Sequence, residues 1–201
     1  MKNNRSGKAA IFKQQDITKI RKNLTNEKHR LIFEIALHTG ERMGAICQLQ
    51  VSDVYADAAN SVPHETITFQ ARTRKARPDG TRETRQVPVH ENLKEHLKSY
   101  QPPESGYLFP GRITRNDLNS KPITRRAVDK YWRELFTKLN MDNRGFSTHS
   151  TRRTLITALD NNGVSVKQMK AITGHKNTDV LLGYIDTNPE RLKNTINAIQ
   201  I

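Results

Sequence analysis

The sequence contains one cysteine, Cys47, among 201 residues, so no disulfide can form within the chain. Cys47 stands in the apolar stretch Ile46-Cys47-Gln48-Leu49. A free cysteine in such surroundings packs as a small hydrophobic residue far more often than it acts as a nucleophile. We therefore expect a buried structural thiol.

Long apolar runs are also missing. No window of about 18 consecutive apolar residues exists, and the start of the chain, Met1-Lys2-Asn3-Asn4-Arg5, lacks the apolar core of a secretion signal. Neither a membrane partner nor export is indicated. We expect a cytoplasmic protein.

Positive charge is present in excess. Lysine and arginine number 34 against 20 acidic residues, which gives a net charge of +14. A protein with this net charge has a positive electrostatic field that attracts polyanions, so nucleic acid is the predicted partner. Six of the cations gather around the turn Pro78-Asp79-Gly80. We expect this loop to contact DNA phosphates, the alternative being a merely solvated loop. The six are Arg72, Arg74, Lys75, Arg77, Arg82 and Arg85.

Hydrophobic periodicity predicts a mostly α fold with a small antiparallel β-sheet (α+β). Residues 1–14 are polar, basic and aperiodic and predict a flexible tail, whereas 15–201 are expected to form one domain without repeats. The expected strands are 65–69 and 85–89. Two helices are expected at the start of the domain, the first beginning near residue 16 and the second over 27–38. Further helices are expected over 42–49, 90–100, 122–139, 150–161 and 165–173, and a short one near 177. The helix over 122–139 carries the apolar repeat Ile123, Ala127, Tyr131, Leu135 and Leu139, and a last helix after Pro189 carries the stripe Leu192, Ile196 and Ile199.

Five short motifs follow one another along the chain. They are Thr39-Gly40-Glu41-Arg42, Lys75 in the basic turn, His149-Ser150-Thr151-Arg152, Gly174-His175, and Tyr184, nine residues after His175. Each alone is common by chance, but the ordered set resembles the tyrosine recombinases, or phage-integrase family. The resemblance covers residues 16–188 and implies the catalytic-domain fold of that family. It also implies a site-specific recombinase or integrase of bacterial, phage or other mobile-element origin.

Attack on a phosphodiester needs the residue types found in these motifs. Two guanidiniums, Arg42 and Arg152, would bind the non-bridging oxygens, where charge grows in the transition state. Tyr184 would attack as nucleophile and His149 would take its proton. Lys75, the only lysine between Lys28 and Lys94, would protonate the leaving 5′-oxygen.

The resemblance gives His175 a supporting role, as a hydrogen-bond donor to the phosphate beside the nucleophile. A 3′-phosphotyrosine keeps the bond energy, so no ATP or other cofactor is expected. The cations replace a divalent metal ion, and no metal site is expected. The remaining histidines show no metal-ligand spacing. These are His29, His38, His64, His90 and His96.

Several alternatives stay open. Arg153 is the second choice for the clamp and otherwise a DNA contact. A type IB topoisomerase would share the same residues. A non-catalytic DNA-binding regulator would keep the fold alone. A hydrolytic nuclease would use His149 and His175, although no carboxylate cluster supports a metal-dependent one.

Full-length members of the family usually carry a helical core-binding domain before the catalytic one. About fifteen residues precede the first expected helix here, so that domain is expected to be absent, in a short member or a catalytic fragment. The resemblance implies double-stranded DNA and other protomers as partners, in a tetrameric synapse. It is compatible with a monomer without DNA. The last helix would dock on a neighbouring protomer or on its own chain.

Overall fold

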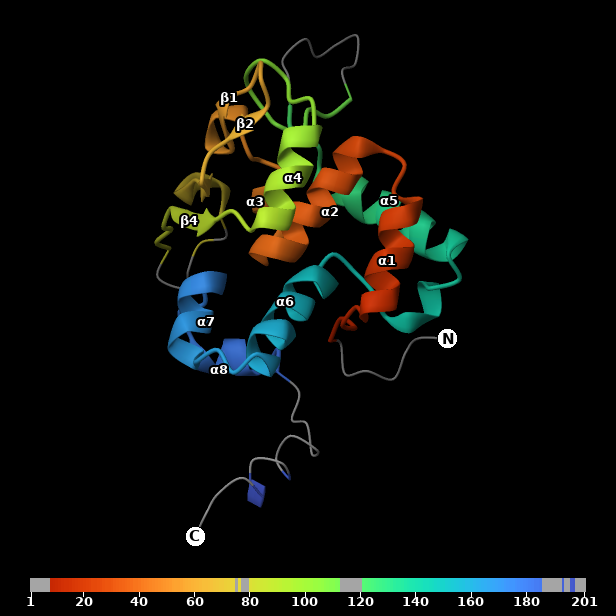
Figure 1. Cartoon of the computed structure of the whole chain (residues 1–201), viewed down its shortest axis with the longest axis vertical. Helices are drawn as coiled ribbons and strands as arrows, with labels where there is room; N and C mark the ends of the chain where they lie inside the picture. The colour runs from red at the N-terminus through yellow and green to blue at the C-terminus, as the bar shows by residue number, and fades with distance from the viewer. Residues whose placement is uncertain are drawn as a thin grey trace. The chain divides into compact units, whose positions relative to one another are not determined.

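The computed structural model describes residues 8–74, 76, 80–112, 121–185, 193, 196 and 197. The chain divides into two compact units, Met1–Leu155 and Ile156–Ile201, and the boundary falls within one helix, α6 (Ser150–Asn161). Each unit has its own hydrophobic cluster. Figure 1 shows the order of the elements.

The first unit is mostly helical. Its helices before α6 are α1 (Gln14–Asn23), α2 (Glu27–Thr39), α3 (Met43–Ile46), α4 (Glu91–Ser99) and α5 (Arg125–Lys138). Its strands are β1 (Tyr55–Asp57), β2 (Val62–Pro63), β3 (Thr66–Phe69) and β4 (Arg85–Pro88), and single 3-10 turns lie at Val51–Asp53, Ala71–Thr73 and Asp142–Arg144.

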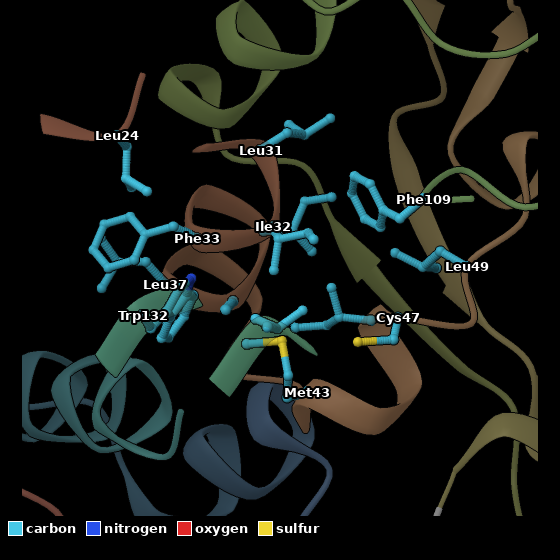
Figure 2. Packing of buried hydrophobic residues seen from close by; sticks show 14 of the residues in the cluster. Leu24, Leu31, Ile32, Phe33, Leu37, Met43, Cys47, Leu49, Phe109 and Trp132 are labelled. Carbon is cyan, nitrogen blue, oxygen red and sulfur yellow. The ribbon is translucent and has the colours of Figure 1, made fainter. Parts of the chain in front are cut away.

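Helix α2 is the centre of this unit because its apolar residues lie on nearly all sides. The side chain of Asn26 caps its start by accepting a hydrogen bond from the backbone N–H of His29 at 3.1 Å. Figure 2 shows Ile32 and Phe33 of α2 among side chains from other elements. Phe33 meets Trp132 of α5 edge to face, with ring centroids 5.6 Å apart. The helix predicted over 27–38 is confirmed.

The predicted flexible tail is wrong for residues 10–13. Phe12 is buried, and its ring centroid lies 4.5 Å from that of Phe146 and 6.0 Å from that of Phe33. The backbone N–H of Phe12 donates to Thr154 Oγ1 at 2.9 Å. A single phenylalanine in a polar stretch has no periodicity, so its burial could not be seen from the sequence pattern.

The two predicted strands are confirmed as an antiparallel pair, β3 and β4, with Thr66 opposite Pro88 and Phe69 opposite Arg85. A second pair, β1 and β2, was not predicted. These strands have three and two residues, too few for an alternating pattern to be recognised.

Helix α5 exists as predicted but starts later, and its buried face overlaps the predicted stripe only in part. Pro122 forms an isolated bridge with Pro110 and lies before the helix, and Thr124 caps it by accepting from Ala127 N–H at 3.1 Å. The predicted stripe was Ile123, Ala127, Tyr131, Leu135 and Leu139. The buried residues within the helix are Val128, Trp132, Leu135 and Phe136.

The second unit contains the rest of α6 with α7 (Val166–Thr173) and α8 (Thr178–Leu182). Gly174 ends α7 in the left-handed conformation, as its sequence position predicts. Its cluster is built on Ile156, Met169 and Leu181. In the predicted last helix, Leu192 and Ile199 lie outside the described residues, and Ile196 is 67% exposed.

Phe12→Ala tests the corrected position of the N-terminal segment. Loss of a buried ring is expected to lower the free energy of unfolding by about 3 kcal/mol, as measured by urea denaturation. Lys8→Ala, at an exposed position, is the control and should change little. Equal stabilities of the two variants would contradict the packing of Phe12.

Candidate active site

The first candidate residue, Arg42, follows a tight turn at the end of α2. Gly40 occupies it with φ +59°, and a Cβ there would lie 2.9 Å from Leu155 Cδ2. Both the conformation and the space therefore require glycine. Arg42 then provides the N-cap position of α3, with extended backbone angles.

Two buried arginines hold this turn by its carbonyl oxygens. Arg85 of β4 donates from Nη2 to the Thr39 carbonyl at 2.9 Å, and Arg152 of α6 donates from Nη1 to the Gly40 carbonyl. Arg152 is 2% exposed. The two predicted clamp residues, Arg42 and Arg152, are therefore brought together within the first unit.

Glu41 is a buried carboxylate that sequence reasoning left without a role. Its Oε2 accepts from Arg85 Nη1 at 2.8 Å and lies 3.2 Å from Arg74 Nε, while its Oε1 accepts from the backbone N–H of Arg42 at 2.8 Å. Burial alone would raise the pKa of Glu41, but these cations and the Arg42 N–H outweigh it and lower that pKa. Glu41 therefore joins the Arg42 turn to the hairpin as an anion.

His149 lies just before α6 and belongs to the same neighbourhood. Partial burial and the positive charges of Arg125, Arg152 and Arg42 lower its pKa, and Asp129 opposes them. The ring is therefore neutral at neutral pH, the form that can accept a proton. Its charge interactions show that His149 lies near both predicted clamp arginines.

The guanidinium of Arg42 makes no hydrogen bond to another described residue. The side chain is half-buried, so its charge is partly shielded from water. This differs from Arg85, whose donors hold Thr39 and Glu41. Arg42 can therefore offer its planar fork to an incoming phosphate.

The basic hairpin loop lies only partly within the residues that the structure describes. Lys75 and Arg77 lie outside the described residues. Arg72 and Arg82 are exposed, and Arg82 Nη1 donates to the Arg72 carbonyl at 2.7 Å. Arg74 instead turns inward, with its side chain 12% exposed beside Glu41. Of the described arginines in this loop, Arg72 and Arg82 have the surface access that a DNA contact needs.

Arg153 was predicted to contact DNA, but its side chain is buried. It is 6% exposed, and its Nη1 donates to the Ala9 carbonyl at 2.6 Å. A helix turns about 100° per residue, so Arg152 and Arg153 point to different surroundings. Arg152 holds the Arg42 turn and Arg153 holds the N-terminal segment.

The second unit brings together the other two candidates, His175 and Tyr184. Their ring centroids lie 5.3 Å apart with the planes tilted by 55°. Tyr184 is half-buried at the edge of the Ile156, Met169 and Leu181 cluster, and its backbone N–H donates to the Leu181 carbonyl at 2.9 Å. His175 is buried and bonded to Thr173.

Other candidate chemistry is not supported by the described residues. Cys47 is buried, and burial raises the pKa of its thiol to about 12, as expected for a structural cysteine. No three described His, Cys, Asp or Glu side chains are grouped to hold a metal ion. None of the described helices is long and apolar enough to cross a membrane.

Comparison with known proteins identifies the family. The model of the phage integrase family matches residues 11–191. The chain belongs to this family. It is 26% identical over 167 residues to tyrosine recombinase XerC of Pediococcus pentosaceus and 22% identical over 173 residues to XerD of Staphylococcus saprophyticus. These alignments cover 81% and 85% of this chain but 50% and 54% of the relatives, so the chain spans about half their length.

Solved structures of a recombinase and of two integrases confirm the fold. The crystal structure of XerA recombinase matches with a TM-score of 0.69 at 19% identity, covering 96% of this chain and 66% of that one. The catalytic domain of bacteriophage HP1 integrase matches with a TM-score of 0.60 at 20% identity, and the match covers 95% of each chain. The Tn1549 transposon integrase, solved in complex with transposon right end DNA, matches with a TM-score of 0.68 at 18% identity. The match covers 97% of this chain and 67% of that one. The predicted tyrosine recombinase catalytic-domain fold is therefore correct.

Sequence reasoning missed three residues that this integrase-family structure places around the candidates. Glu41 and Arg125 adjoin Arg42 and His149 in the first unit, and Thr173 bonds His175 in the second. The position of Glu41 within the Thr-Gly-x-Arg turn, next to Arg42, could have marked it from the sequence as a neighbour of the candidate site. Nothing local marks Arg125 among its basic neighbours.

Glu41→Gln tests the buried ion cluster. The amide leaves Arg85 and Arg74 without a counter-charge, and removing one partner of a buried pair typically costs about 3 kcal/mol or more. Urea unfolding measures the loss. The control is Glu65→Gln, whose side chain is 80% exposed beside Lys94 and whose ion pair contributes little. Similar small changes in both variants would contradict a role for Glu41.

The pKa of His149 is directly measurable by NMR titration of its ring. Without DNA, its midpoint is expected below the ordinary value of about 6.5, and Arg125→Gln is expected to raise it by removing a nearby positive charge. Arg126→Gln, at the exposed position next to Arg125 on α5, serves as the control because Arg126 is not among the charges that act on His149. A midpoint at or above the ordinary value would contradict this electrostatic environment.

Proposed function

We propose that this chain cuts and rejoins DNA strands as a site-specific recombinase or integrase, through a 3′-phosphotyrosine on Tyr184. Membership of the phage integrase family supports the class of reaction. The observation that carries the assignment of residues is the meeting of Arg42, Arg152 and His149 in one cationic neighbourhood. These residues come from distant parts of the sequence.

The cationic neighbourhood suits a phosphate in the transition state. Arg42 and Arg152 would bind the two non-bridging oxygens, whose charge increases as the phenol oxygen approaches phosphorus. Neutral His149 would accept the phenol proton. The bond from phosphorus to the 5′-oxygen breaks as the bond to Tyr184 forms, and the leaving 5′-oxygen takes a proton from Lys75.

Rejoining reverses the same steps. A 5′-hydroxyl from another strand attacks the phosphotyrosine and gives its proton back to Lys75. Tyr184 leaves with the proton returned by His149. One phosphate ester replaces another in each direction, so no ATP is consumed. The cations supply the charge that a metal ion supplies in many nucleases.

The two groups of residues lie in different units of the chain. The proposed reaction requires His175 and Tyr184 to act on the same phosphate as Arg42, His149 and Arg152. Double-stranded DNA is the proposed substrate because the net charge is +14 and the exposed Arg72 and Arg82 extend the positive surface. A tetramer of protomers on DNA is proposed for strand exchange.

A nicked suicide duplex tests the nucleophile. Cleavage near the nick releases a short strand and traps the protein as an adduct that survives SDS. Wild-type chain is expected to form it and Tyr184→Phe to form none, with Tyr107→Phe as the matched control. An adduct with Tyr184→Phe would overturn the assignment.

Arginine variants test the clamp with the same duplex. Arg42→Ala is expected to slow adduct formation on the order of a hundred- to a thousandfold, because a preorganised donor to the transition state is lost. DNA affinity, measured by fluorescence anisotropy, should fall much less. Adduct that forms only with added Mg²⁺ would contradict the metal-free mechanism. Relaxation of a supercoiled plasmid without strand exchange would indicate the topoisomerase alternative.

A further inference from the structure

Thr173 ends helix α7 two residues before His175, and it is fully buried. Its hydroxyl oxygen lies 2.6 Å from the Met169 carbonyl and 2.7 Å from His175 Nδ1. Both distances are those of good hydrogen bonds. The hydroxyl therefore has two partners, one on its own helix and one on the candidate histidine.

The directions of these two bonds follow from counting protons. A carbonyl oxygen only accepts, so the single hydroxyl proton of Thr173 is directed to Met169. The hydroxyl oxygen then has only lone pairs to offer to His175. Nδ1 must carry a proton and donate it to Thr173.

A neutral imidazole has one N–H, so a protonated Nδ1 leaves the lone pair on Nε2. We propose that Thr173 is a positioning residue that holds neutral His175 in the Nδ1–H form and fixes the orientation of its ring beside Tyr184. The effect of Thr173 on catalysis rests on the proposed recombinase function. The tautomer of His175 does not depend on that function.

The tautomer changes what His175 can do for a phosphate. Neutral His175 offers the phosphate an acceptor at Nε2, which gives no attraction to phosphate oxygens. Only the doubly protonated ring donates from Nε2, and that hydrogen bond is charge-assisted. A donor role of His175 toward a phosphate therefore requires the doubly protonated ring, whose Nδ1–H still donates to Thr173.

Thr173 is accordingly distinct from a residue that only fills space. Its methyl group packs in the interior of the unit, whereas its hydroxyl sets a proton position. Serine keeps the hydroxyl and removes the methyl. Valine keeps the shape and removes the hydroxyl. The two substitutions separate the roles.

The test begins with the tautomer in the full 201-residue chain without DNA. Nitrogen-15 NMR at a pH where the rings are neutral distinguishes Nδ1–H from Nε2–H, and the His175 signals are identified by their loss in His175→Gln. Wild type and Thr173→Ser are expected to show Nδ1–H. Thr173→Val is expected to lose it. A wild-type ring in the Nε2–H form would overturn the proposal even if Thr173→Val does not fold.

Adduct formation on the suicide duplex gives the second readout. Thr173→Val is expected to be about ten- to a hundredfold slower with DNA affinity unchanged, the range typical when the partner that orients a functional histidine is lost. Thr173→Ser should retain most of the rate. A loss in Thr173→Ser equal to that in Thr173→Val would assign the effect to packing and overturn the proposal, as would a wild-type rate in Thr173→Val.

Thr157→Val is the matched control. Thr157 Oγ1 is buried but has no hydrogen-bond partner among the described residues, so the same substitution there should change neither the tautomer nor the rate. If the wild-type chain shows Nδ1–H at His175 but forms no adduct on any duplex, the proposed function fails and the tautomer assignment stands.

Discussion

The backbone carbonyls of Thr39 and Gly40 each accept a hydrogen bond from a buried arginine, Arg85 or Arg152. A buried guanidinium is costly unless its donors are satisfied, so these bonds fix where β4 and the start of α6 meet the end of α2. Arg42 leaves the same turn. The position of the candidate clamp therefore depends on a turn that is held from two sides.

Glu41 makes this concentration of cations compatible with a stable fold. Its carboxylate faces Arg85 and Arg74 and accepts the Arg42 backbone N–H. Arg85 and Arg74 are thereby neutralised inside the protein. The guanidinium of Arg42, without a hydrogen bond among the described residues, keeps its charge available to a ligand. Arg85 and Arg74 therefore serve the fold, whereas Arg152 both holds the Gly40 carbonyl and belongs to the proposed clamp.

Most of the fold followed from the sequence because its helices have clear ends. Asn26 and Gly40 bound α2, and Ser165 and Gly174 bound α7, so these helices were predicted to within a residue or two. Errors arose where local pattern is weak. Phe12 gives no periodicity, and the buried face of α5 depends on which neighbours it packs against.

The sequence by itself determined the family, the order of the main helices and of the β3–β4 pair, and the candidate residues, because these depend on residue types and spacing along the chain. Only the tertiary structure decided which arginines are buried and which are exposed, since Arg85 and Arg153 are buried by partners far away in the sequence. It also decided the proton position on His175, because a hydroxyl proton directed at the Met169 carbonyl is a matter of geometry and leaves no trace in residue spacing.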